Sequence, residues 1–312
     1  MRIGVLMGGR SLERDISLRS GRRVSHALKE LGHEVLELDV DESLVPSLRK
    51  SRPDLVYIAL HGKFGEDGTV QELLEIMDIP YTGPGVFASA MGFNKALSKE
   101  VFMRENIPTP PFFVLSEATF QEMGALHALQ TVGEKLGYPL VVKPVAQGSA
   151  LGVKMVPSEE TLASAVLSAL HYDERVLLEK YVSGTEVAVS ILGNQELETL
   201  PLVETVPHSA FFDFDSRYTP GLTEYYCPAR IDEEAARRAV EVACRTHRAL
   251  GCLNVSRVDI IIDESGVPQV LELNISPGMT ETSLLPMAAS AAGMDFKDLV
   301  GRLVKLAMEK YS

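Results

Sequence analysis

The sequence predicts an α/β protein whose first part is a doubly wound domain. Residues 3–7 form an apolar run that ends in two glycines, and apolar residues then recur at helical spacing from position 16 to position 31. Two further short strands are expected at 33–40 and 54–60, with a helical segment between them. Strands that alternate with helices over the first ninety or so residues favour a parallel sheet covered on both faces.

The length of 312 residues exceeds one ordinary hydrophobic core, so two or three domains around a cleft are expected. The hydrophobic pattern changes near residues 83–85, and the prolines of residues 107–111 indicate a linker. We therefore expect a Rossmann-like N-terminal domain at 1–93, a central subdomain at 94–182 and a C-terminal subdomain at 183–312.

Composition excludes several classes of partner. A net charge of −13 argues against binding to nucleic acid or to an anionic membrane, although a local basic pocket for phosphate is compatible with it. The three cysteines form neither a CxxC pair nor a disulfide framework, as is typical of a reducing compartment. The N-terminal apolar run is too short for a signal sequence, and no run approaches membrane-spanning length. A cytoplasmic location is expected.

Two apolar arms around residues 265–266 predict a β-hairpin near the C-terminus. If the turn is centred there, Asp259 lies opposite Glu272 and Arg257 lies opposite Asn274. Side chains on a strand alternate between two faces, so these four side chains share one face. The intervening residues are expected to point into a core: Val258, Ile260, Leu271 and Leu273.

The side chains on the polar face suit a metal ion that is shared with phosphate groups. Asp, Glu and Asn oxygens are hard ligands, and so few of them favour Mg²⁺ over a closed calcium cage. Arg257 would stand beside that ion, and the turn at residues 277–280 can cradle an anion or a carboxylate. The alternative interpretation is a surface hairpin whose outward face is merely charged.

Two polar positions follow strands of the first domain, at the edge where such sheets bind ligands. Glu13 follows the first strand, and His61 follows the third and opens a loop that carries three glycines. An ordered loop of this composition usually carries function. Glu13 can instead be a carboxylate favoured at a helix start, and Gly8-Gly9 without GxGxxG does not indicate a dinucleotide site.

The middle of the chain carries a second set of candidates. A strand ends at Lys143, and the Gly148-Ser149 loop that follows can fold over phosphates or be an ordinary hairpin loop. The strand end at residues 179–182 can present backbone groups to a purine edge, or be a plain strand. The long aromatic loop at 208–227 is expected to be a lid.

Five stretches of the chain, taken together, match one family. They are residues 61–68 (HGKFGEDG), Lys143 with Gly148-Ser149, residues 212–214 (FDF) with Tyr218, Arg257 with Asp259, and residues 271–280 (LELNISPGMT). At these distances and in this order they resemble the D-alanine:D-alanine ligases, which are ATP-grasp enzymes. The resemblance runs essentially from Met1 to Ser312.

The resemblance implies a fold and an activity. The first domain would hold substrate, and the other two subdomains would form a two-part ATP-grasp fold. ATP would phosphorylate the carboxylate of one D-alanine, and the amine of a second would displace phosphate to give D-alanyl-D-alanine for peptidoglycan precursors. No protein nucleophile is needed. The resemblance also implies a homodimer whose partners are small molecules, with no nucleic acid and no membrane.

The resemblance further implies roles for individual residues. Asp259, Glu272 and Asn274 would hold two Mg²⁺ ions, with Mn²⁺ as an alternative. The ATP-binding residues would be Lys95, Lys143, Gly148, Glu179, Lys180, Tyr181, Val182 and Glu186. The catalytic residues would be Glu13, Ser149, Arg257, Tyr218, Gly278 and Ser283, with His61, Arg217 and Leu284 binding substrate.

Within this set, Glu13 would bind the ammonium of the first D-alanine, and Ser149 and Tyr218 would be linked to it by hydrogen bonds. Arg257 and the Gly278 amide would stabilise the oxyanion. Ser283 would take the carboxylate of the second substrate. The pattern departs from the family at four places: Arg217 replaces Lys, Ala150 replaces Ser, residues 92–94 replace the usual Met-Asp, and Ile275 replaces Thr.

Two rival functions remain open at this point. One is a ligase of the same fold with another second substrate, such as D-lactate or D-serine, and Tyr218 weighs against the lactate form. The other is a nucleotide-binding protein without turnover, which only the departures near Lys95 and at Arg217 support.

Overall fold

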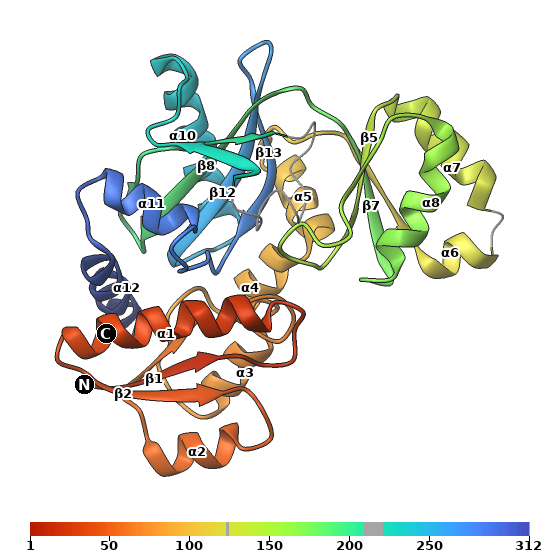
Figure 1. The fold of residues 1–312 in the computed structure, drawn as a ribbon. Coiled ribbons are helices and arrows are strands. Elements are labelled where there is room, and N and C mark those ends of the chain that lie inside the picture. The colour runs from red at the N-terminus through yellow and green to blue at the C-terminus, as the bar shows by residue number, and fades with distance from the viewer. Residues whose placement is uncertain (123–124, 209–220, 312) are drawn as a thin grey trace.

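The computed structural model describes residues 1–122, 125–208 and 221–311. Three β-sheets follow one another along the chain (Figure 1). A three-stranded sheet lies in the red and orange N-terminal part and a four-stranded sheet in the yellow-green part, and in this view a six-stranded sheet lies above the first and to the left of the second. The described helices cover these sheets, and none of them is long and apolar enough to cross a membrane.

The first sheet is parallel, with the strand order β2-β1-β3. Its residues alternate between two cores, because Ile3 and Val5 of β1 pack with α1 and α12, whereas Leu6 packs with α2 and α3. The doubly wound arrangement predicted from the sequence is therefore confirmed. The elements are β1 (Arg2–Met7), α1 (Arg14–Glu30), β2 (Glu34–Asp39), α2 (Leu44–Ser51), β3 (Leu55–Ile58) and α3 (Thr69–Ile76).

Two helices, α4 (Val86–Phe93) and α5 (Lys95–Arg104), lead from the first sheet to the second and pack against β13. The second sheet is antiparallel, in the order β4-β7-β5-β6, and α7 and α8 pack with the core that it buries. Its elements are β4 (Phe112–Ser116), α6 (Glu117–Glu122), α7 (Ala125–Leu136), β5 (Leu140–Pro144), β6 (Lys154–Val156), α8 (Glu159–Leu170) and β7 (Arg175–Lys180).

The third sheet is antiparallel and runs β11-β10-β8-β12-β13, with β9 paired to β8. The helix α10 packs on one face, while α11 and α12 share a core with the first domain on the other. The elements are β8 (Gly184–Gly193), β9 (Leu197–Thr199), β10 (Val203–Pro207), β11 (Thr223–Tyr226), α10 (Glu233–Ala249), β12 (Asn254–Asp263), β13 (Pro268–Asn274), α11 (Leu284–Ala291) and α12 (Phe296–Lys310).

The C-terminal hairpin has the pairing that the sequence predicts at its polar face. Asp259 lies opposite Glu272, and Arg257 lies opposite Asn274. The register shifts by one residue between Asp259 and Ile260, which marks a β-bulge. The prediction that Leu271 points into the core is wrong: the bulge turns Leu271 toward a pocket, and Val270 is buried in its place.

The predicted lid at 208–227 is only partly described by the structure. Residues 223–226 form the strand β11 on the edge of the third sheet, so this part of the segment is not a loop as predicted. Thr205 and Tyr225 are partners in that pairing. Arg217 and Tyr218 lie outside the described residues.

Candidate active site

Three adjoining pockets lie where the sheets meet. The inter-sheet pocket lies between the second and third sheets and is lined by Lys143, Glu179 and Asp259, among others. The interdomain pocket lies between the first domain and the third sheet, and Glu13 and Ser283 line it. A smaller connecting pocket shares Lys95, Gln147 and Glu272 with the former and Glu66, Gly148, Ser149 and Asn274 with the latter.

Two lysines meet one buried carboxylate at the wall of the inter-sheet pocket. Lys143 Nζ lies 2.6 Å from Glu179 Oε1, and Lys99 Nζ lies 2.5 Å from Glu179 Oε2. Lys99 is fully buried, and its ammonium also donates to the hydroxyl of Thr109. Two cations against one anion leave an excess positive charge beside the pocket, which suits phosphate groups.

The charges of this cluster are set by burial and by each other. Burial alone would raise the pKa of Glu179, but the two lysine ammonium groups outweigh it and hold that pKa below its ordinary value. Burial lowers the pKa of Lys99 to about 8, although Glu179 opposes this shift. The carboxylate of Glu179 is therefore ionised at neutral pH and keeps both lysines in place.

The hairpin places a second group of charges at the junction of the pockets. Arg257 binds both carboxylate oxygens of Asp259, with Nε and Nη2 each 2.7 Å from an oxygen. Lys95 Nζ lies 3.1 Å from Glu272 Oε2 and donates to the carbonyl oxygen of Gln147 at 2.7 Å. Lys95 begins α5, Glu272 lies on β13 and Gln147 follows β5. The two contacts of Lys95 therefore link the second sheet, the third sheet and helix α5.

The oxygen atoms at this junction fit a hard divalent cation. Asp259 and Glu272 are cross-strand partners, and Asn274 lies two residues farther along the same face of β13. In the part of the chain that the structure describes, no group of three or more His, Cys, Asp and Glu side chains could hold a metal ion. An ion held here would therefore also need the amide oxygen of Asn274 and oxygens of a bound phosphate.

Glu13 lies at the start of α1, 5% exposed, and accepts a hydrogen bond from the Ser149 hydroxyl. Two glycines make room for it, because a Cβ on either Gly62 or Gly148 would lie 2.6 Å from Glu13 Oε2. Ser149 itself has φ +54°, a left-handed conformation that is rare for a residue with a side chain. The loop after β5 is thus shaped to bring Ser149 onto a carboxylate of the first domain.

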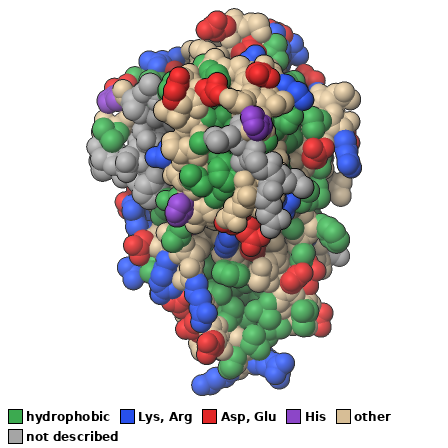
Figure 2. All heavy atoms as spheres, turned by 90° about the vertical axis from the view of Figure 1, so that its right-hand side faces the viewer, with side chains coloured by type: hydrophobic (Ala, Val, Ile, Leu, Met, Phe, Trp, Pro, Cys, Tyr) green, Lys and Arg blue, Asp and Glu red, His purple; other side chains and the backbone are tan. Residues whose placement is uncertain are grey.

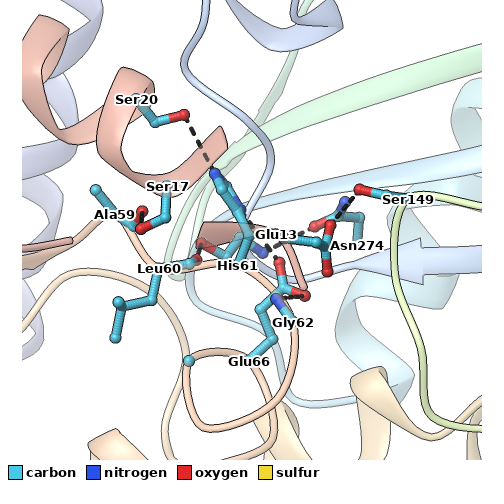
Figure 3. A network of polar contacts seen from close by, with 12 residues as sticks. Glu13, Ser17, Ser20, Ala59, Leu60, His61, Gly62, Glu66, Ser149 and Asn274 are labelled. Carbon is cyan, nitrogen blue, oxygen red and sulfur yellow. Dashed lines mark hydrogen bonds and ion pairs between the residues drawn. The ribbon is translucent and has the colours of Figure 1, made fainter. Parts of the chain in front are cut away.

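His61 lies in a polar network beside Glu13 and points toward Ser20 (Figure 3). Its Nδ1 lies 3.5 Å from Glu66 Oε1, and its Nε2 lies 3.2 Å from the Ser20 hydroxyl. Glu66 also accepts a hydrogen bond from the backbone N–H of Gly62 at 3.1 Å. Burial lowers the pKa of His61, but the hydrogen bond and charge of Glu66 outweigh burial, and the net pKa is raised.

The turn after β13 closes the interdomain pocket. A Cβ on Gly278 would lie 2.7 Å from Ser283 Oγ, so the hydroxyl fits only because residue 278 has no side chain. Ser283 Oγ accepts a hydrogen bond from the backbone N–H of Thr280 at 3.0 Å and lies 2.8 Å from its hydroxyl. These contacts fold residues 277–283 into a compact turn beside Arg257.

The structure brings the described candidates into two groups. The inter-sheet pocket is lined by Lys95, Lys143, Glu179, Lys180, Tyr181, Val182, Glu186, Asp259 and Glu272. The interdomain pocket is lined by Glu13, His61, Gly148, Ser149, Arg257, Asn274, Gly278, Ser283 and Leu284. Lys99 was missed by the sequence reasoning, although its place four residues after Lys95 puts both on one face of a helix.

Known proteins are similar to this chain over almost its whole length. The family "D-ala D-ala ligase C-terminus" matches residues 101–305, and "D-ala D-ala ligase N-terminus" matches residues 45–84. A D-alanine–D-alanine ligase of Pelotomaculum thermopropionicum is 44% identical over 99% of this chain and 97% of its own.

Solved structures of similar proteins agree. A D-alanine–D-alanine ligase of Bacillus anthracis complexed with ATP has a TM-score of 0.84 and 32% identity, covering 99% of this chain and 98% of that one. The VanG D-Ala:D-Ser ligase of Enterococcus faecalis has a TM-score of 0.82 and 29% identity, covering 98% of this chain and 99% of that one. The ATP-grasp fold expected from the sequence is confirmed.

Proposed function

The chain belongs to the D-alanine–D-alanine ligase family. We propose on that basis that it joins two D-alanine molecules in a reaction that converts ATP to ADP and phosphate. The product, D-alanyl-D-alanine, is a building block of peptidoglycan. The observation that carries the proposal is that the connecting pocket shares lining residues with both other pockets, Lys95 and Glu272 with the inter-sheet pocket and Ser149 and Asn274 with the interdomain pocket. A phosphate bound at this junction can reach a carboxylate in the interdomain pocket.

ATP fits the inter-sheet pocket by its chemistry. Residues 180–182 at the end of β7 can meet the purine, and Leu271 and Ile261 offer apolar contacts on the opposite wall. Glu186 on β8 suits the ribose hydroxyls. Lys143, which Glu179 holds in place, and Lys95 then face the phosphates, where two ammonium groups offset the negative charge of the transferring phosphoryl group.

The first D-alanine fits the interdomain pocket with its ammonium on Glu13, because this buried carboxylate lines the pocket and its negative charge attracts a cation. The Ser149 hydroxyl orients that carboxylate, and His61 closes the same side. The substrate carboxylate then points toward the connecting pocket. There it can receive the phosphoryl group and become an acyl phosphate.

The second D-alanine attacks the acyl phosphate from the side of the turn after β13. Its carboxylate can bind the Ser283 hydroxyl, and the Arg257 guanidinium with the Gly278 amide can meet the oxyanion that forms. The carbonyl carbon gains the bond to the nitrogen of the neutral amine, and the bond to the phosphate oxygen breaks. The proton that the nitrogen loses is taken up by the phosphate, which leaves as inorganic phosphate. Asp259 positions Arg257 for this step through two hydrogen bonds.

We propose that Asp259, Glu272 and Asn274 hold two Mg²⁺ ions, with Mn²⁺ as an alternative. The support is that these oxygen ligands lie on one face of the hairpin formed by β12 and β13 and line the pockets. Bound there with ATP, such ions would neutralise charge on the phosphates. In this structure Asp259 forms an ion pair with Arg257, and Glu272 forms one with Lys95. Bound metal ions would therefore lie beside these side-chain cations or take their place at the carboxylates.

Three further predictions concern the domain division, the location and the oligomeric state. We propose the domain division 1–93, 94–182 and 183–312, which the three sheets support. We propose a cytoplasmic location, where ATP is present.

We propose a homodimer, supported by Ile76 and Phe87, which are 81% and 85% exposed on the neighbouring helices α3 and α4. Hydrophobic side chains gather on the lower part of the face in Figure 2.

The test of the activity is a substrate panel. Purified protein is given ATP and Mg²⁺ with D-alanine alone, D-alanine plus D-serine, D-alanine plus D-lactate, or L-alanine, and phosphate and products are quantified. The proposal predicts D-alanyl-D-alanine as the main product. D-alanyl-D-serine or D-alanyl-D-lactate as the main product would show that the enzyme uses another second substrate. ATP binding without phosphate release would show that the protein binds nucleotide without turnover.

A further inference from the structure

Met279, in the turn after β13, is bound by the first domain through both its backbone N–H and its backbone carbonyl. The N–H of Met279 donates to the Ser20 hydroxyl at 3.3 Å, and the carbonyl oxygen of Met279 accepts from Arg23 Nη1 at 2.7 Å. Ser20 and Arg23 are three residues apart on α1, so they lie on one face of that helix. The sequence reasoning assigned neither residue to the site.

The helix that provides this contact is itself fixed in place. A Cβ on Gly21 would lie 2.6 Å from Met7 Cβ, so α1 packs closely on β1. The guanidinium carbon of Arg23 lies 4.0 Å from the centre of the Phe296 ring on α12, which holds the side chain from another direction. Ser20 is fully buried, and its hydroxyl also lies 3.2 Å from His61 Nε2 (Figure 3).

Met279 stands between the two groups proposed to act on the second D-alanine. Gly278, which precedes it, offers its amide to the oxyanion, and Thr280, which follows it, binds the Ser283 hydroxyl. Glu13, which would hold the first D-alanine, lies at the start of the same helix α1. The helix α1 therefore contacts the sites proposed for both substrates.

We propose that Ser20 and Arg23 are positioning residues that hold the Met279 backbone and thereby place the Gly278 amide and the Ser283 hydroxyl for attack by the second D-alanine. This inference rests on the proposed ligase function. Neither side chain lines the inter-sheet pocket, so their loss should leave ATP binding intact. A misplaced turn should slow the attack of the amine, while the acyl phosphate still forms and is lost to water.

The experiment compares Ser20→Ala, Arg23→Met and Arg23→Lys with matched controls on the same helix. Ser25→Ala removes a buried hydroxyl that has no hydrogen-bond partner among the described residues, and Arg22→Met removes an exposed guanidinium. For each variant we would measure phosphate released per dipeptide formed, and KM for ATP and for each D-alanine. Circular dichroism and thermal unfolding check that each variant is folded.

The wild type should release one phosphate per dipeptide. Ser20→Ala and Arg23→Met should raise that ratio and raise KM for the second D-alanine by about tenfold, as expected when a hydrogen bond that orients a binding group is lost, with KM for ATP nearly unchanged. Arg23→Lys, which keeps a cationic donor, should recover part of the loss. Both controls should behave like the wild type.

The inference would be overturned if the folded Ser20→Ala and Arg23→Lys variants released one phosphate per dipeptide and kept the wild-type KM for the second D-alanine. This test holds even if Arg23→Met does not fold. Equal loss of every kinetic parameter would overturn it as well, because a merely structural role has that signature. Failure of the wild type to form dipeptide would instead reject the proposed function, so the two failures are distinguishable.

Discussion

A Cβ placed on Gly92 would lie 2.5 Å from Cγ2 of Ile275. From the sequence, residues 92–94 and Ile275 are expected to depart from the family pattern, and Gly92 and Ile275 both line the connecting pocket, so these two stretches meet at one place in the fold. Gly92 lies inside α4, and Ile275 follows β13. The absence of a side chain at 92 therefore provides the room that the larger, fully apolar side chain at 275 requires.

We predict that Gly92→Ala destabilises the protein by about 1–3 kcal/mol, the usual cost of overpacking a buried contact. Alanine is the better helix former by about 1 kcal/mol, so a net loss would show that the clash dominates. The double variant Gly92→Ala with Ile275→Ala should lose less stability than the sum of the two single variants. Urea denaturation of all four proteins measures this coupling, and strict additivity would argue against it.

The buried cluster of lysines and Glu179 predicts an order of stabilities. Glu179→Gln leaves two ammonium groups beside a neutral amide, and a broken buried ion pair costs about 3–5 kcal/mol. Lys99→Met should cost less, because Glu179 keeps Lys143 and the methionine fills the apolar space. The exposed pair of Lys29 and Glu37 is the control.

Glu37→Gln should change the free energy of unfolding by no more than about 1 kcal/mol. Chemical denaturation at pH 7 ranks the three variants. A cost for Lys99→Met that equals or exceeds that of Glu179→Gln would contradict the assignment of Glu179 as the shared partner.

The pKa of Lys99 predicts a pH dependence of stability. Its pKa is about 8 in the folded protein, below the value of 10.5 for an ordinary lysine, so the unfolded chain binds the proton more tightly. The resulting penalty is present in full below pH 8 and is relieved as the pH rises from about 8 to 10.5. The stability of the wild type relative to Lys99→Met should therefore rise over this window. A flat or falling difference would show that the pKa of Lys99 is not depressed.

The proposed metal ligands predict a loss of turnover without a loss of fold. Glu272→Gln is the variant to test, because Asp259→Asn would disturb Arg257, which is proposed to stabilise the oxyanion. Glu272→Gln weakens the contact with Lys95, but Lys95 keeps its hydrogen bond to the carbonyl oxygen of Gln147. Glu272→Gln should lower kcat by at least about a hundredfold, an effect typical of lost charge stabilisation in a transition state, at unchanged thermal stability. Turnover close to that of the wild type at saturating Mg²⁺ would exclude Glu272 as a ligand. A raised requirement for Mn²⁺ would support it.

The C-terminal hairpin shows how far sequence reasoning reaches. The predicted pairing of Asp259 with Glu272 assumed a turn centred between residues 265 and 266. In the structure Asp263 and Val267 are linked by a hydrogen bond from N–H to carbonyl across a three-residue turn, which shifts the register by one. The bulge near Leu271 shifts it back, so the pairing is right because two departures cancel. A bulge depends on long-range packing and leaves no local signal in this sequence.

The site shows a different limit. Motif residues could be placed because each follows a strand or opens a glycine loop, positions at which function gathers. Lys99 and Ser20 look like ordinary helix residues in the sequence. Their roles depend on their partners in the fold. Lys99 contacts Glu179, which lies 80 positions farther along the chain, and Ser20 contacts Met279, which lies 259 positions farther along. Such contacts between distant segments are set by tertiary packing, which periodicity does not encode.

The proposed reaction depends on an acyl phosphate that forms on the first D-alanine. The most direct measurement uses D-alanine with oxygen-18 in its carboxyl group and follows the label by mass spectrometry. If the acyl phosphate forms, each phosphate released carries one labelled oxygen and is accompanied by one molecule of D-alanyl-D-alanine. Unlabelled phosphate, or label recovered in AMP, would contradict it.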